Sequence, residues 1–221
     1  MGVAQKVIQK IKEFLIPNKH LTLLHKQNCL HADYLAIDLE LTGLNPKEDE
    51  IVSIAWLPIK NQKIYVCQGE HFINSQVSCL KKSPIFHGIN QQAVQSGQPL
   101  TKALLKLVSL LDCVVLVFHN AELDWAFLQK AFIEHGIIFS TEQYKSIIIL
   151  DTMKIEHKRL SRLSHDISFD ALNLEKCRHR YNLPDYSNHN ALTDAMVTAE
   201  LFLAQINHIS SGKPLAVKSL L

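Results

Sequence analysis

"YLAIDLELTGLNP", residues 34–46, carries two acids inside an otherwise apolar run. The run ends in Thr-Gly and Asn-Pro, a pattern typical of a strand that leads into a turn. Residues two apart on a strand share a face, so Asp38 and Glu40 project together. Two carboxylates directed at one spot repel each other and raise each other's pKa. The stretch therefore predicts either a cation bound beside the pair or a pair on the solvent face of an edge strand.

A third acid follows another buried strand. In "FHNAELDWAFL", residues 118–128, Asp124 falls in the first turns of a helix that comes directly after an apolar run. Ligand sites in sheet folds form where strands end and helices begin. Carboxylate oxygens are the ligands that Mg²⁺ and Mn²⁺ prefer. The position of Asp124 therefore favours the cation over the solvent-exposed pair.

A third stretch, "HNALTDA" at residues 189–195, brings a histidine and another acid. His189 and Asp194 are five apart, and on one regular helix they would diverge by about 140°. They converge if His189 precedes the helix, which Asn190 as the N-cap would allow. We expect Asp194 to point from the turn that follows.

Strands come first along the chain, and strand–helix alternation follows. Such an order predicts a mixed α/β sheet with three antiparallel N-terminal strands, then parallel strands, flanked by helices. The expected strands are 34–41, 51–59, 63–68, 113–118 and 147–150. The expected helices are 101–111, 122–135, 152–163, 170–181 and 190–207.

Three motifs in this order resemble those of the DEDDh, DnaQ-like 3′–5′ exonuclease family. They are Asp38-x-Glu40 before "TGL", "HNA" with Asp124, and His189-x-x-x-x-Asp194. The resemblance spans residues 33–204, with further similarity at "HGI" (87–89) and "LDTM" (150–153). It implies a ribonuclease H-like fold similar to the exonuclease core of the DNA polymerase III epsilon subunit.

The family's chemistry implies a role for each acid. By resemblance, Asp38, Glu40 and Asp194 hold the first of two divalent cations, Mg²⁺ or Mn²⁺. Asp38 and the scissile phosphate hold the second, and Asp124 assists through water. His189 takes the proton from the attacking water. These five residues are the predicted catalytic set.

Substrate contacts follow from the same resemblance. Leu41, Thr42 and Asn120 are expected to meet the terminal nucleotide. Many relatives carry Thr directly after the Glu, whereas this chain has Leu41 there. The exchange affects contacts to the nucleotide and leaves the acids unchanged.

The implied partner is a nucleic acid with a 3′ end, with single-stranded DNA favoured. An RNA-trimming enzyme of the oligoribonuclease or RNase T type is the alternative within the enzyme class, because a few contacts decide whether a 2′-OH is accepted. A proofreading-type subunit of a polymerase or repair assembly is a further alternative. No clamp-binding Q-x-x-L-x-L-F segment is evident, which favours a freestanding exonuclease.

Composition points to a cytoplasmic protein. The 221 residues are 47% hydrophobic with a net charge of +2, and the five cysteines include no C-x-x-C. Odd, scattered cysteines favour reduced thiols. No signal peptide and no apolar run of about 20 residues is evident, so no membrane insertion is expected.

We expect three parts along the chain. Residues 1–30 form an amphipathic helix (3–15) and a connector, 31–208 the exonuclease domain, and 209–221 a short mobile tail. The apolar face of the first helix suits its own domain, a partner or a membrane surface.

Overall fold

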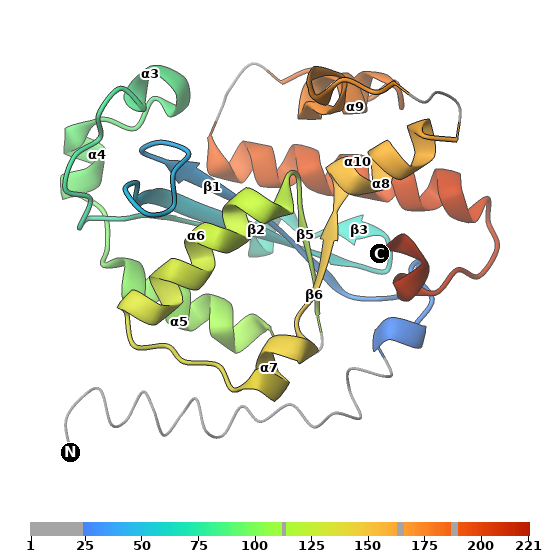
Figure 1. Ribbon diagram of the computed structural model, residues 1–221, viewed down its shortest axis with the longest axis horizontal. Coiled ribbons are helices and arrows are strands. Elements are labelled where there is room, and N and C mark those ends of the chain that lie inside the picture. Colours follow the sequence, from blue (N-terminus) through green and yellow to red (C-terminus); the bar gives the residue numbers. More distant parts are fainter. Residues whose placement is uncertain (1–23, 112–113, 163–165, 187–189) are drawn as a thin grey trace.

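The computed structural model describes residues 24–111, 114–162, 166–186 and 190–221. At its centre is a six-stranded mixed sheet in the order β3–β2–β1–β5–β6, with β4 paired to β2 (Figure 1). The strands are β1 Tyr34–Leu41, β2 Ile51–Lys60, β3 Lys63–Ile64, β4 Glu70–Ile73, β5 Val115–Phe118 and β6 Ile148–Asp151. β1 runs antiparallel to β2 and parallel to β5, which is parallel to β6. The predicted fold class is confirmed.

Helices lie on both sides of this sheet (Figure 1). The α-helices are α3 Pro84–His87, α4 Gln91–Gln95, α5 Leu100–Leu110, α6 Ala121–Glu134, α7 Thr141–Ser146, α8 Thr152–Leu160, α9 Leu174–His179 and α10 Ala191–Ser210. The 3₁₀ turns within the described residues are η1 Val66–Gln68, η2 Phe169–Leu172 and η3 Val217–Leu220.

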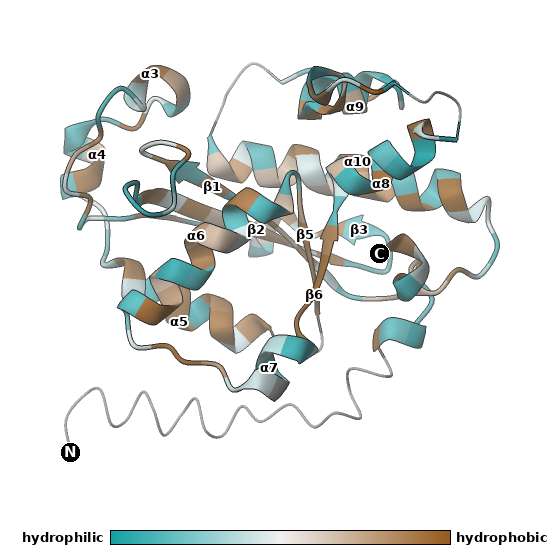
Figure 2. Cartoon of the chain, in the orientation of Figure 1, coloured by the Kyte–Doolittle hydropathy of each residue, from teal (hydrophilic) through white to brown (hydrophobic). Residues whose placement is uncertain are grey.

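The alternation of β1 divides the core into two layers. Leu35 and Ile37 join the core cluster that includes α5 and α6, whereas Tyr34 and Ala36 join the cluster that includes α8 and α10. Figure 2 shows the hydrophobic residues concentrated on β6 and α5. Asp38 continues the register of Tyr34 and Ala36, so it lies on the α10 face of the sheet.

The third predicted strand is only partly correct. Asn61 and Gln62 both have positive φ and make a two-residue turn, after which β3 pairs for two residues and the chain enters η1 instead of continuing to residue 68. The sequence also gave no sign of β4, which pairs with β2 from Ser53 to Trp56. Glu70-His71 breaks the apolar alternation by which strands are recognised.

The last helical predictions need smaller corrections. α8 ends at Leu160, and the 170–181 span is divided into η2 and α9 by Asn173, whose side chain caps α9 by accepting from the Lys176 N–H. The helix predicted at 3–15 lies outside the described residues. None of the described helices is long and apolar enough to span a bilayer.

The expectation of a mobile tail is wrong for its final part. The Val217 N–H donates to the Gln27 carbonyl at 2.9 Å, and Ala216 bridges to Asn28. Val217 and Leu220 are buried in the α10-side cluster. The 3.6-residue and two-residue periods of the sequence do not reveal such a contact, because the tail is ordered by distant residues.

Candidate active site

Three carboxylates meet where β1 ends. Oxygens of Asp38, Glu40 and Asp194 all lie within 4.8 Å of one another. Asp194 comes from the first turn of α10, and the side chain of Asn190 caps that helix by accepting from the Thr193 N–H at 3.0 Å. The predicted N-cap is therefore confirmed, and the predicted convergence of these three acids is what the fold produces.

Directly after Glu40 the register of β1 on β2 slips. Glu40 lies opposite Ser53, but Leu41 lies opposite Ile51. A bulge of this kind bends a strand and redirects the side chains that follow it. The loop after β1 can therefore turn away while Asp38 and Glu40 keep one face.

Asp124 lies in the first turn of α6, and Asp151 fixes that turn. The buried Asp151 carboxylate accepts the N–H groups of Asn120 at 3.0 Å, Ala121 at 3.1 Å and Met153 at 2.9 Å. One acid therefore holds the start of α6 and the start of α8 at the end of β6. The sequence showed Asp151 only as part of "LDTM"; an acid directly after an apolar strand and before a helix is the signal of such a cap.

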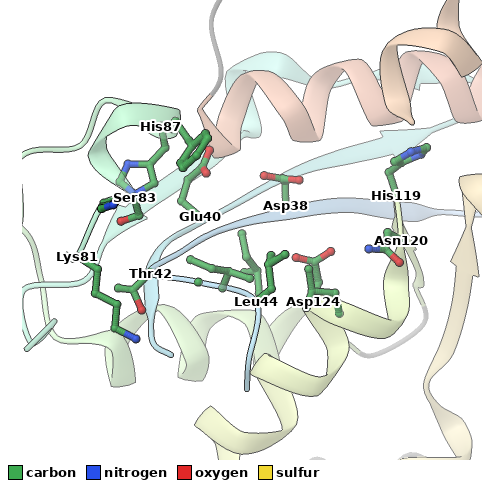
Figure 3. A pocket seen from close by; sticks show the side chains of 16 residues that line it. Asp38, Glu40, Thr42, Leu44, Lys81, Ser83, His87, His119, Asn120 and Asp124 are labelled. Carbon is green, nitrogen blue, oxygen red and sulfur yellow. The ribbon is translucent and has the colours of Figure 1, made fainter. Parts of the chain in front are cut away.

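A pocket of about 830 Å³ is lined by the end of β1 and the loop after it, by residues 81–87 and by the start of α6. Asp38, Glu40 and Asp124 line it, and so do the predicted substrate residues Leu41, Thr42 and Asn120. Lining residues that the sequence did not single out are Leu44, Lys81, Lys82, Ser83 and Phe86. In Figure 3 the acids lie between Lys81, Ser83 and His87 at one end and His119 and Asn120 at the other.

The surroundings of the pocket acids raise their pKa values. Burial, and then the charges of Asp124, Asp194 and Glu40, raise the pKa of Asp38 well above its usual range. Burial and Asp194 raise the pKa of Glu40 to about 7. Burial and Asp151 raise the pKa of Asp124. The side chains that act on Asp38 within the described residues are all acidic.

The donor set fits a divalent cation. Oε1 of Glu40 is buried and meets no hydrogen-bond donor among the described residues. A buried carboxylate oxygen without a donor is costly, and a cation supplies the missing partner. Carboxylate oxygens from three side chains are hard ligands of the kind that Mg²⁺ and Mn²⁺ take.

Three histidines belong to the motifs or to the pocket lining. His189, the predicted general base, lies outside the described residues. His87 lines the pocket, its Nδ1 accepts from the Ile89 N–H at 3.0 Å, and its Nε2 is buried without a hydrogen-bond partner among the described residues. His119 pairs through Nδ1 with the Thr152 hydroxyl at 2.8 Å, and burial lowers its pKa to about 4. His119 is therefore neutral near pH 7.

Comparison with known proteins agrees with this geometry. A family model described as Exonuclease, RNase_T, matches residues 35–202. The chain belongs to this exonuclease family, and the family predicted from the motifs is confirmed.

The relatives include proteins of two kinds. The chain is 26% identical over 180 residues to a DNA polymerase III of the PolC type from Caldanaerobacter subterraneus, covering 81% of this chain but 12% of that protein. It is 25% identical over 189 residues to a ribonuclease T from Buchnera aphidicola, covering 78% of this chain and 83% of that one. The chain thus spans about an eighth of the polymerase and most of the ribonuclease.

Solved structures share the fold. Cell-death related nuclease 4 superposes with a TM-score of 0.67 at 18% identity, over 82% of this chain and 66% of that one. E. coli exonuclease I in complex with a dT13 oligonucleotide also gives 0.67, at 14% identity, over 82% of this chain and 42% of that one.

Proposed function

We propose that this protein is a divalent-metal-dependent 3′–5′ exonuclease that releases nucleoside 5′-monophosphates, with single-stranded DNA as its substrate. The observation that carries the proposal is the meeting of Asp38, Glu40 and Asp194 within 4.8 Å beside a large open pocket. Among the described residues, burial and neighbouring acids raise the pKa values of Asp38 and Glu40, and no cationic side chain is among the groups that act on them. Family membership supports the same reaction class.

The chain's residues divide the work. Two bound Mg²⁺ or Mn²⁺ ions would activate a water molecule and neutralise charge on the phosphate. Asp38, Glu40 and Asp194 would hold one ion, and Asp38 would hold the other with Asp124 acting through water. His189 would accept the proton of the attacking water, for which its ordinary pKa of about 6.5 is suited.

The other lining residues would orient the terminal nucleotide. Leu41, Thr42 and Asn120 would contact its sugar and base. Leu44 and Phe86, 76% and 75% exposed, offer apolar surface at the mouth of the pocket. A volume of about 830 Å³ is within the range of small-ligand pockets and suits a nucleotide.

The test is digestion of matched 5′-labelled single-stranded DNA and RNA with Mg²⁺ or Mn²⁺. Asp38→Asn and EDTA serve as negative controls, and Asp170→Asn, which removes an exposed carboxylate on η2, serves as the matched variant. We expect a ladder that shortens from the 3′ end, kept by Asp170→Asn and abolished by Asp38→Asn. No degradation of either strand with any metal would contradict a freestanding enzyme.

Two further readings have their own support. Similarity to a ribonuclease T over most of that protein's length supports RNA as substrate, and the RNA arm of the assay decides it. Similarity to PolC-type polymerases supports action beside a polymerase or repair protein. Co-purification of a polymerase with the tagged protein from its own cells would favour that reading.

A further inference from the structure

Asp49 organises the loop that follows the metal-site acids. Its buried carboxylate accepts from the Thr42 hydroxyl at 3.2 Å and from the Asn45 N–H at 2.9 Å. Gly43 packs so closely that a Cβ there would overlap the carboxylate. The Asp49 carbonyl also accepts from the Lys130 ammonium at 3.1 Å. The first wall of the pocket, residues 42–44, is therefore folded around this one side chain.

The second wall, residues 81–83, is tied to the same place. The Lys81 ammonium forms an ion pair with the Asp49 carboxylate, although the two residues are 32 apart in sequence. Lys81 has a φ of 52°, in the left-handed region that non-glycine residues seldom adopt. Glu50 adds a second tie, because its Oε2 accepts from the Ser78 N–H at 2.8 Å and the Ser78 hydroxyl at 2.9 Å.

These ties connect two segments that both line the pocket. Thr42, Gly43 and Leu44 belong to the first wall, and Lys81, Lys82 and Ser83 belong to the second. Figure 3 shows the Lys81 side chain extending past Thr42, away from Asp38. The Lys81 ammonium is therefore paired with Asp49 and does not point at the acid cluster.

We propose that Asp49 is a positioning residue for the substrate. By pairing with Lys81 it sets the separation of the two walls, and so holds the terminal nucleotide against the acids at the end of β1. This inference rests on the proposed exonuclease function. It goes beyond that function because Asp49 itself is assigned no contact with substrate or metal.

Simple electrostatics predicts the opposite result, which makes the inference testable. Nucleic acid is a polyanion, so removing the Asp49 charge and freeing Lys81 would by charge alone strengthen binding. If Asp49 acts by fixing the walls, Asp49→Asn weakens binding instead. A purely structural defect would lower the fraction of folded enzyme and hence kcat, leaving KM unchanged.

The experiment measures kcat and KM on a 5′-labelled oligonucleotide for Asp49→Asn, Lys81→Gln and Lys81→Arg, with thermal unfolding of each. The control is Asp170→Asn, which breaks the exposed pair with Lys176. We expect KM to rise about fivefold in Asp49→Asn and Lys81→Gln with kcat within about twofold. Lys81→Arg should restore most of the KM, and the control should match the wild type.

If the wild type is active and Asp49→Asn leaves KM unchanged or lowers it, the positioning role of Asp49 is overturned and the proposed function stands. An inactive wild-type protein would instead overturn the proposed function. Should Asp49→Asn fail to fold, Lys81→Gln still decides, because Lys81 is about half exposed and its replacement leaves the Thr42 and Asn45 contacts in place. A lost phosphate contact would lower the salt dependence of KM, whereas displaced walls raise KM and leave its salt dependence unchanged. A lowered salt dependence in Lys81→Gln would therefore overturn the role of the Asp49–Lys81 pair.

Discussion

Two acidic centres lie on the α10 side of the sheet, and they are built in opposite ways. Glu156 on α8 is fully buried, and it accepts from Arg159 at 2.6 Å, from the Tyr181 hydroxyl at 2.8 Å and from Gln205 at 3.4 Å. Burial alone would raise the pKa of Glu156. The hydrogen bonds from Arg159 and Tyr181 outweigh burial and hold that pKa below its ordinary value.

At the end of β1 the balance is reversed. Burial and neighbouring acids both raise the pKa of Asp38, and Glu40 has a buried oxygen without a donor among the described residues. Among the described residues, Glu156 is surrounded by hydrogen-bond donors, whereas the charged groups that act on Asp38 are all acids. A protein retains such repulsion where function requires it, so the contrast separates a stabilising centre from a candidate catalytic one.

The Asp38→Asn variant tests the difference between the two centres most strongly. We expect kcat to fall by about a thousandfold or more, because the carboxylate that we propose as a ligand of both ions would lose its charge. The metal-free variant should unfold at the same temperature as the wild type or higher, since one repelled carboxylate is removed. Activity and thermal unfolding measured on the same preparation check both parts. A variant that loses stability in proportion to activity would make Asp38 a structural acid.

Glu156→Gln should show the opposite behaviour. Removing the charge leaves the Arg159 guanidinium without its ion-pair partner. We therefore expect the free energy of unfolding to fall by about 3 kcal/mol. Urea unfolding measures the loss, with Glu175→Gln on α9 as the exposed control. A loss below about 1 kcal/mol would mean that this network contributes little stability.

His119 gives the smallest expected effect. Its pKa is lowered to about 4, while the unfolded chain titrates near 6.5. Between these pH values the His119 side chain binds a proton in the unfolded state but not in the folded state, so the free energy of unfolding falls as the pH falls. From pH 7 to 4.5 the metal-free wild type should lose about 2 kcal/mol more than His119→Gln, measured by urea unfolding at both pH values. Equal losses would show that His119 titrates normally in the folded protein.

Local rules predicted much of the site. The two-residue period of a strand placed Asp38 and Glu40 on one face, and the capping preference of Asn identified the start of α10 before Asp194. Both depend on residues within a few positions of each other. The roles of these acids in catalysis, and that of His189, stay predictions.

The remaining features depend on contacts between distant residues. The Asp49–Lys81 pair spans 32 positions, and the Asp151 carboxylate caps the start of α6 some 30 positions earlier in the chain. β4 is defined by its pairing with β2 and not by its own alternation. Local periodicity carries no information on such pairings, and that is why the second wall of the pocket was not foreseen.

We infer that the partner missing at the end of β1 is a divalent cation. Calorimetric titration of Mn²⁺ into the metal-free protein at pH 7.5 tests it most directly, with Asp38→Asn and Asp170→Asn alongside. We predict saturable binding to the wild type and to Asp170→Asn, and its loss in Asp38→Asn. No saturable binding to the wild type, or equal binding to Asp38→Asn, would show that these acids do not form a cation site.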